Sequence, residues 1–485
     1  MLFNSYEFIF FFLPITFFIY FYLNKKRFTT ASKAFLVFAS LFFYSWWNIV
    51  YLPLILVSML VNYTLGRELA NFGVKSRKVS AKKLLTFGIV FNLGLLGYFK
   101  YTDFFILNYN RLMHTEHHLW HLALPLAISF YTFQQIAYLV DSYRQETKEY
   151  DFLNYSLFVT FFPQLIAGPI VHHAEMMPHF SQLRNKIKNS YNIALGLFIF
   201  SMGLFKKVVI ADTFAQWVTL GFDLSESLNM LEAWTTSLSY TLQLYFDFSG
   251  YTDMAIGIAL LFNIKIPMNF FSPYKATSIQ DFWRRWHITL SRFLRDYIYI
   301  PLGGNRKGEI RTYSNLLITF LLGGIWHGAG WTFVLWGLLH GLALMIHRAW
   351  SKFKITLPTL FGWFITFNFL NITWVFFRAE NFQDAMKVLN GMFRGELVVP
   401  SSLAMYLESV KAYGVHFGNW SKLFAGENYL IVWLFTGLSI VLFLPNSMEW
   451  KEKFKPNFFY MILTIIFSLS IFMLYRKSEF LYFNF

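Results

Sequence analysis

Long apolar stretches recur along the whole chain and leave little of it to face water. They lie near residues 8–23, 34–47, 49–65, 84–99, 122–141, 152–171, 191–211, 234–263, 312–325, 328–347, 357–377, 429–444 and 457–475. A transmembrane helix needs about 20 such residues, and several stretches are shorter, so tilted, re-entrant or buried segments are expected among them. Charged residues make up 14% of the sequence, against about 25% in a soluble domain. We therefore predict an all-α polytopic membrane protein with about eleven transmembrane helices.

The excess of basic residues fits membrane topology better than nucleic-acid binding. There are 41 Lys and Arg against 26 Asp and Glu, a net charge of +15. The basic residues lie in short segments between apolar stretches, the pattern of cytoplasmic loops and anionic lipid contacts. The first apolar stretch precedes Lys25, Lys26 and Arg27 and is expected to be a retained span. We assign four clusters to the cytoplasm: Arg67, Lys75, Arg77, Lys78, Lys82 and Lys83; Arg144 and Lys148; Arg184, Lys186 and Lys188; Lys451, Lys453 and Lys455.

The sequence lacks the residues and motifs that several kinds of catalysis require. The chain has no cysteine, which excludes disulfides and thiolate chemistry. It has no G-x-S-x-G, H-E-x-x-H or Gly-Lys-Ser/Thr phosphate loop. A histidine repeat at His114, His117, His118 and His121 has a spacing that can bind zinc, but it lies between spans and no metal site is expected there. His172, His173 and His179 are expected to face solvent or lipid headgroups.

The segment from Ser278 to Tyr299 predicts an amphipathic interfacial helix rather than a span. At about 100° per residue, its aromatic and aliphatic side chains form one stripe and its charged side chains the opposite face. Ser278 caps its start and Pro301 ends it. His287 lies at the edge of the apolar stripe, where it can turn inward. The charged face comprises Asp281, Arg284, Arg285, Arg292, Arg295 and Asp296.

A histidine surrounded by glycines, His327 in the segment Gly323–Trp331, is the strongest candidate for chemistry. Ionisable residues at membrane depth are costly and usually functional, and the neutral imidazole is the least costly of them. Small neighbours allow a helix or an acyl chain to approach closely. A core histidine bonded between helices is the equal alternative. Of the next two histidines, His340 is expected to be structural and His347 interfacial.

Two aspartates, Asp247 and Asp253, flank a glycine within an apolar stretch. They are compatible with an ion site at a broken helix. We favour the alternative, in which they pair with the arginine face of the segment 278–299.

Taken together, these motifs resemble the membrane-bound O-acyltransferase family, in particular its branch that O-acetylates alginate and peptidoglycan. The resemblance begins at Phe3–Pro14, continues through F-F-P-Q-L-I-A-G-P-I at Phe161–Ile170 and Y-F-D-F-S-G-Y-T-D-M-A-I-G at Tyr245–Gly257, and ends with F-L-Y-F-N-F. It is densest at Phe282–Gly304 and Gly323–Gly341, which read F-W-R-R-W-H-I-T-L-S-R-F-L-R-D-Y-I-Y-I-P-L-G-G and G-G-I-W-H-G-A-G-W-T-F-V-L-W-G-L-L-H-G.

The resemblance implies a ring of roughly eleven helices with a funnel from each face. It matches the invariant histidine of the family to His327, and the second functional position of the superfamily to His287. The acyl group would enter from the cytoplasm, with acetyl-CoA as donor, and leave through an esterase-like (SGNH) periplasmic partner for a polysaccharide. Alginate, peptidoglycan and other envelope glycans all remain open as acceptors. The location implied is the bacterial inner membrane, and residues 1–485 form one domain with a catalytic core near 191–350.

The expected mechanism is acyl transfer with His327 as general base, or a covalent relay. His287 would donate to the oxyanion or orient the acyl carbonyl. Trp283, Trp286, Trp326 and Trp331 would wall the tunnel and exclude water. Arg284, Arg285, Arg292 and Arg295 would bind donor phosphates, or else lipid headgroups. The alternatives are an ion-coupled transporter that uses the two aspartates and a non-catalytic scaffold for a periplasmic acetyltransferase.

Overall fold

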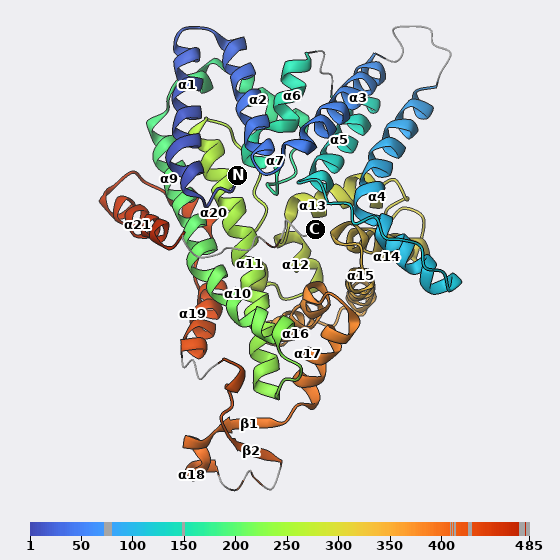
Figure 1. The fold of residues 1–485 in the computed structure, drawn as a ribbon, viewed down its shortest axis with the longest axis vertical. Helices are drawn as coiled ribbons and strands as arrows, with labels where there is room; N and C mark the ends of the chain where they lie inside the picture. The colour runs from blue at the N-terminus through green and yellow to red at the C-terminus, as the bar shows by residue number, and fades with distance from the viewer. Residues whose placement is uncertain are drawn as a thin grey trace.

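The chain folds as a helical bundle with a small extension at one end (Figure 1). The computed structural model describes residues 1–71, 80–147, 151–407, 409, 411, 414–424, 429–474 and 481. Lys75, Arg77, Lys78 and Lys148 of the basic clusters lie outside the described residues, as does the closing motif apart from Leu481.

The helices fall into three consecutive groups along the chain. The first comprises η1 (Glu7–Phe12), α1 (Leu13–Lys25), α2 (Thr29–Ser45), α3 (Leu52–Ala70), α4 (Ala81–Met113), α5 (Ile128–Tyr143), α6 (Phe152–Thr160), α7 (Phe162–Leu165) and α8 (His173–Ser181). The second comprises α9 (Ser190–Phe205), η4 (Lys206–Ala211), α10 (Asp212–Thr219), α11 (Met230–Leu261), α12 (Ile279–Arg285), α13 (Ile288–Leu294), η7 (Arg295–Tyr299), α14 (Glu309–His327) and α15 (Trp331–Lys352). The third comprises α16 (Thr359–Arg378), α17 (Phe382–Arg394), α18 (Ala404–Leu407), α19 (Tyr429–Phe443), α20 (Ser447–Lys453) and α21 (Phe458–Ser468).

Six helices among the described residues are long and apolar enough to cross a membrane, or seven if the bent pair α19 and α20 is one span. They are Glu7–Lys25, Ile49–Ala70, Ala81–Met113, Ser190–Leu224, Trp331–Lys352 and Thr359–Arg378. The apolar stretch 152–171 is not among them, because it breaks at Phe161 into α6 and the four-residue α7, which has Pro163 in its first turn. The chain is therefore a multi-pass membrane protein in which several apolar stretches form shorter helices.

Helix α11 lies in the core of the bundle and is buried around most of its circumference, its two aspartates included. It packs along α9 through glycines. A side chain at Gly203 would meet the Gly250 main-chain oxygen, and one at Gly257 would meet that of Gly196. Such close contact is typical of small residues at membrane helix interfaces.

The two aspartates of α11 pair with lysines of η4, not with the arginine face of the segment 278–299. Lys206 Nζ lies 2.7 Å from the Asp253 carboxylate, and Lys207 Nζ lies 2.6 Å from Asp247 and 2.8 Å from Asp212. The expectation of pairing is met with different partners. Each lysine supplies the opposite charge that a carboxylate needs inside a bundle.

The segment 278–299 is not one continuous helix, as the periodicity predicts, but breaks at His287 into α12 and α13. The backbone of His287 has φ +41°, in the left-handed region. Residues 269–271 form main-chain hydrogen bonds with α12 and α13 at the break. The Phe271 N–H donates to the Arg285 carbonyl at 2.9 Å, and the Ile288 N–H to the Asn269 carbonyl at 3.0 Å. These tertiary bonds replace helical ones, so the break turns the ring of His287 into the core.

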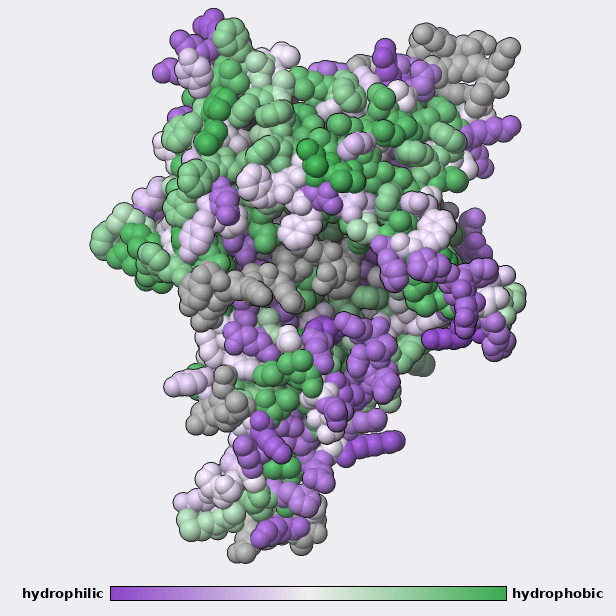
Figure 2. All heavy atoms as spheres, viewed as in Figure 1, coloured by the Kyte–Doolittle hydropathy of each residue, from purple (hydrophilic) through white to green (hydrophobic). Residues whose placement is uncertain are grey.

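A short parallel sheet lies at the end of the extension. Strands β1 (Leu397–Pro400) and β2 (Val415–Gly418) pair with Leu397 opposite Val415. Figure 2 shows many hydrophilic residues over this end of the molecule, whereas hydrophobic residues cover much of the opposite end. The extension therefore has the surface of a water-exposed element.

Candidate active site

His327 is the last residue of α14 and is buried, with 3% of its surface exposed. Its ring lies among aromatic rings, with centroid distances of 4.9 Å to Trp326, 5.1 Å to Trp336 and 5.0 Å to Phe377. Trp331 lies apart from these rings at the start of α15, where it is 51% exposed and its indole donates to Asn108 at 2.8 Å. The site therefore combines one imidazole with a dry aromatic wall that Trp331 does not join.

The position of His327 depends on close packing of α14 against α15. A side chain at Gly337 would meet the Phe320 main-chain oxygen and the Gly324 Cα atom. Gly324 therefore packs against Gly337 of the neighbouring helix. A side chain at Gly328 would instead overlap the ring of Phe333. Gly324 and Gly337 are therefore needed for the backbone contact between the two helices, and Gly328 leaves room for the ring of Phe333.

His287 is fully buried and has a defined tautomer. Its Nδ1 lies 3.1 Å from Oδ1 of Asn269, an oxygen that also accepts the Thr289 main-chain N–H at 3.1 Å. Because this oxygen is an acceptor, Nδ1 of His287 carries the proton and Nε2 has the lone pair. Nε2 has no hydrogen-bond partner among the described residues. The Trp326 ring lies next to both histidine rings, at 6.5 Å from that of His287.

His340 has the structural arrangement that the sequence analysis expected. The indole N–H of Trp283 donates to its Nδ1 at 3.2 Å, and its Nε2 lies 3.2 Å from Thr373 Oγ1. Since an indole can only donate, the proton of His340 is on Nε2 and is given to Thr373. His340 thereby links α12, α15 and α16. Trp286 is also buried and its ring lies 5.0 Å from that of Trp374.

A basic cavity of about 770 Å³ opens between α12, α13, α14 and α15. Trp283 and Phe320 form part of its wall, and Trp283 lies 5.9 Å from Trp336, the ring that contacts His327. Aromatic rings thus separate the cavity from the imidazole. Its basic lining residues are Arg284, Arg292, Arg295, His347 and Arg348. Arg285 is not part of the lining and pairs with Asp281 at 2.8 Å.

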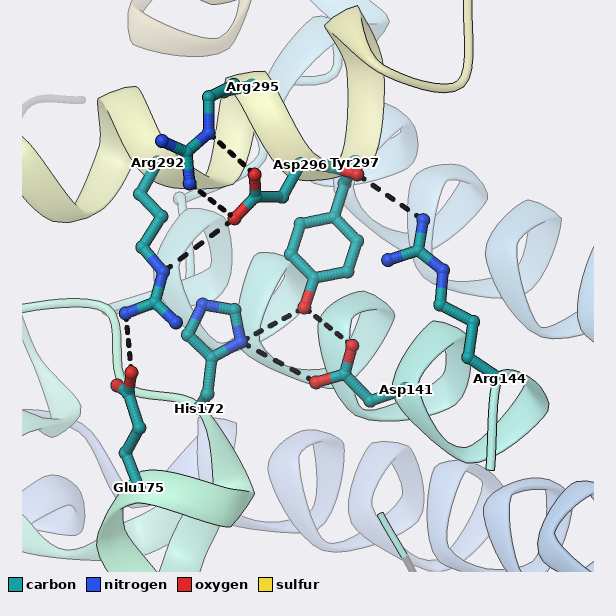
Figure 3. Close-up of polar contacts among 8 residues, drawn as sticks. All are labelled: Asp141, Arg144, His172, Glu175, Arg292, Arg295, Asp296 and Tyr297. Carbon is teal, nitrogen blue, oxygen red and sulfur yellow. Dashed lines mark hydrogen bonds and ion pairs between the residues drawn. The ribbon is translucent and has the colours of Figure 1, made fainter. Parts of the chain in front are cut away.

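Three of the lining arginines already contact carboxylates. Arg348 pairs with Glu309 at 3.2 Å, and Figure 3 shows the contacts of Arg292 and Arg295. Arg292 pairs with Glu175 of α8, and Asp296 lies 2.7 Å from Arg295 and 3.7 Å from Arg292. These contacts are partly exposed, so water screens them and each is worth only about 0–1 kcal/mol. An incoming anion can compete with them.

His172 was expected to face solvent or lipid headgroups, but it is buried next to these residues. The Tyr297 hydroxyl donates to Asp141 at 2.7 Å and lies 3.0 Å from His172 Nδ1. Burial and the nearby Asp141 carboxylate raise the pKa of Tyr297, which keeps its proton available to donate. Figure 3 also shows Arg144 reaching the main-chain oxygen of Asp296, at 3.4 Å. His173 is buried as well, with its ring 5.2 Å from that of Phe158.

A second cavity, of about 320 Å³, lies on the side of His327 that faces α4. Its lining includes Lys100, Asp103, Gly328, Ala329 and Phe333. The carboxylate of Asp103 accepts the main-chain N–H groups of Trp120 and His121. Within the described parts of the chain, no three metal-ligating side chains come together, and this includes the histidine repeat 114–121.

Sequence reasoning missed Lys100, Asn269 and Arg348. A lysine at the end of the apolar stretch 84–99 is itself a signal, because a cation at membrane depth is costly. Asn269 lies in a loop without periodicity, and only the fold brings it to His287.

Comparison with known proteins agrees with this architecture. Residues 32–379 match the membrane-bound O-acyltransferase family. The chain is 55% identical to "Peptidoglycan O-acetyltransferase" of Helicobacter pylori, over 81% of this chain and 80% of that protein. It is 41% identical to "Probable alginate O-acetylase AlgI" of Pseudomonas aeruginosa (81% and 75%), and 27% identical to "Teichoic acid D-alanyltransferase" of Bacillus subtilis (53% and 69%). This chain belongs to the membrane-bound O-acyltransferase family.

Proposed function

We propose that the chain is an O-acetyltransferase that carries acetyl groups across the bacterial inner membrane to hydroxyl groups of peptidoglycan. The observation that carries this proposal is one buried histidine with two cavities near it. One cavity is lined by Gly328, the next residue, and the other, which is strongly basic, is separated from the imidazole by aromatic rings. The similarity to the peptidoglycan O-acetyltransferase supports peptidoglycan as the acceptor. Alginate is the second candidate acceptor, on the lower identity to the alginate O-acetylases.

The predicted cytoplasmic clusters support an orientation for the two cavities. Arg144 belongs to a cluster assigned to the cytoplasm and contacts Asp296 beside the basic cavity, which supports a cytoplasmic opening there. Helix α4 starts next to Lys82 and Lys83 of another cytoplasmic cluster. At about 1.5 Å per residue, Lys100 lies most of a bilayer thickness further along, which supports an outward opening of the second cavity.

Acetyl-CoA would bind in the basic cavity with its phosphates on Arg284, Arg292 and Arg295. Guanidinium groups bind phosphate oxygens through paired N–H donors, and Arg348 adds a fourth such group in the lining. Arg285 is not expected to bind phosphate, because its side chain pairs with Asp281. Lipid phosphates are the competing ligands for the same arginines.

In the chemical step, His327 would act as general base. It takes the proton from the acceptor hydroxyl as that oxygen attacks the thioester carbonyl carbon. The tetrahedral intermediate collapses as the carbon–sulfur bond breaks, and the thiolate recovers the proton from His327. The products are an acetyl ester and the free thiol. The aromatic rings around His327 exclude water, which limits hydrolysis of the thioester.

His287 would stabilise the oxyanion of that intermediate. In the neutral tautomer described above, Nε2 can only accept a hydrogen bond. The role therefore requires the protonated ring, with Nδ1–H still bound to Asn269 and Nε2–H facing the oxyanion.

The remaining helices and the export step complete the proposal. If α2, α5, α11 and α14 also cross the membrane, they and the six or seven long helices would make ten or eleven spans. An esterase-like periplasmic protein would receive the acetyl group outside and pass it to the glycan. The funnels on each face then serve the donor and this partner.

The test replaces His327 by Ala in the native host and measures O-acetyl esters on purified peptidoglycan. Loss of the esters, at a normal level of the protein in the membrane, is expected. His340→Ala is a poor control because it breaks a structural bond. His118→Gln, at an exposed histidine that lines neither cavity, is the matched substitution and should retain acetylation. If the His327→Ala variant acetylates like the wild type, the proposal is rejected and a scaffold role is left. If the variant loses acetylation of alginate alone, alginate and not peptidoglycan is the acceptor.

A further inference from the structure

Lys100 of α4 reaches the end of α14, where His327 lies. Its Nζ donates to the carbonyl oxygens of Trp326 at 2.6 Å and His327 at 3.1 Å, and to Ser129 Oγ at 3.2 Å. An ammonium group has three N–H donors and no acceptor, and these three contacts use all of them. The next residue, Tyr101, donates its hydroxyl to the carbonyl of Ile325 at 2.5 Å. Helix α4 thus binds three successive carbonyls of α14.

The end of α14 needs such a partner. The last carbonyls of a helix have no intrahelical donor, and the chain leaves the helix at Gly328, whose own N–H makes a long bond of 3.4 Å to Gly324. A cation at this end also complements the helix dipole. The residues that follow, Gly328 to Gly330, have no large side chain to fix the turn.

Helix α4 also binds the far side of the turn. Asn108, two turns beyond Lys100, accepts the indole N–H of Trp331 at 2.8 Å, and Phe104 lies 5.8 Å from the same indole. Lys100 itself lines the smaller cavity together with Gly328 and Ala329. The ammonium is therefore placed at the point where the backbone of His327 meets the cavity proposed to open outward.

We propose that Lys100 is a positioning residue for acyl transfer. It holds the backbone of His327, and thereby the direction of the imidazole, through the two carbonyls at the helix end. The inference rests on the proposed function, because it requires His327 to be the base. Lys100 acts through His327 and need not touch the reacting atoms.

The experiment compares four full-length variants in native membranes supplied with radiolabelled acetyl-CoA and peptidoglycan. Lys100→Met keeps the aliphatic stem and removes the donors, Lys100→Arg keeps a cation, Tyr101→Phe removes the neighbouring cap, and His327→Ala is the functional reference. Three quantities are measured: kcat, KM for acetyl-CoA, and hydrogen exchange of the peptide that contains residues 325–331.

Lys100→Met is expected to lower kcat about 10- to 100-fold, the effect of a small misplacement of a catalytic group. KM for acetyl-CoA should stay within twofold, and exchange should rise at residues 325–331. Lys100→Arg should recover part of the loss. Tyr101→Phe removes one of the three carbonyl contacts and should lower kcat less than Lys100→Met does. A merely structural role would not give this split between kcat and KM together with rescue by arginine.

The inference is overturned if His327→Ala is inactive while Lys100→Met turns over like the wild type, or if KM rises as much as kcat falls. An active His327→Ala variant would instead reject the proposed function. Should Lys100→Met not accumulate in the membrane, Lys100→Arg decides alone. In that case a kcat lowered at least threefold at unchanged KM supports the inference, and wild-type kinetics contradict it.

Discussion

Nδ1 of His287 and Oδ1 of Asn269 lie 3.1 Å apart, and the same oxygen accepts the main-chain N–H of Thr289. This arrangement fixes the ring of a residue whose backbone is held in the left-handed region. It also leaves Nε2 as the nitrogen that can face a substrate. The pair explains why a loop asparagine, 18 residues earlier in the chain, belongs to the candidate active site.

The oxyanion role of His287 predicts a graded series. His287→Ala should lower kcat about 10²- to 10³-fold, the usual loss of an oxyanion donor. His287→Asn should lose less, because its amide supplies a neutral N–H donor. Asn269→Ala should lose activity by releasing the ring. The measurement is acetyl transfer in membranes. The control for Asn269→Ala is Asn62→Ala in α3, which also removes a buried asparagine side chain, in this case one that bonds to Asn92. Equal losses for Ala and Asn at position 287 would contradict the role.

The lining of the basic cavity predicts that three neighbouring arginines are not equivalent. Arg284→Ala and Arg292→Ala should each raise KM for acetyl-CoA about 5- to 20-fold, because each removes a charge-assisted hydrogen bond worth about 1.5–3 kcal/mol before screening. Arg285→Ala is the matched control and should leave KM unchanged, since its side chain pairs with Asp281. Retention of KM in all three variants, with reduced binding to anionic vesicles, would assign the arginines to lipid headgroups.

Much of the site was accessible from sequence patterns. The glycine-flanked His327, the buried His340 and the arginines of segment 278–299 were predicted from apolar stretches, spacing and helical periodicity. These patterns are local, because each depends on residues within a few turns of one another.

The remainder depends on contacts between segments far apart in the chain. Helical periodicity cannot show that residues 269–271 take over the hydrogen bonds at His287 and break the helix. Nor can it show that Asp141 and Tyr297 draw His172 into a buried network, or that Lys206 and Lys207 approach α11. The number of spans was equally uncertain, because hydropathy does not distinguish a long helix from two short ones.

Lys207, one of the two buried lysines of η4, predicts a large effect on stability. Lys207→Met removes the cation beside Asp212 and Asp247 and should destabilise the protein by about 3–5 kcal/mol, the cost of breaking a buried ion pair from one side. Lys352→Met is the control, because Lys352 pairs with Glu309 on an exposed face, where a pair is worth about 0–1 kcal/mol. Thermal unfolding in detergent measures both. A midpoint for Lys207→Met within a degree of the control would show that the pair does not hold η4 to α11.

Close packing of α14 and α15 predicts that one methyl group will affect the site. An alanine Cβ at position 337 would lie 2.5 Å from the Phe320 carbonyl oxygen, so Gly337→Ala must push the helices apart. Overpacking of this kind costs about 1–3 kcal/mol, and the shift should lower kcat because α14 carries His327. Gly94→Ala in α4 is the matched control, since no atom lies within 4 Å of its Cβ. That change should be neutral or stabilising by about 0.5–1 kcal/mol, because alanine favours the helix. Unfolding midpoints and acetyl transfer of the two variants provide the comparison. If Gly337→Ala matched Gly94→Ala in both, backbone contact between α14 and α15 could not be what fixes the imidazole.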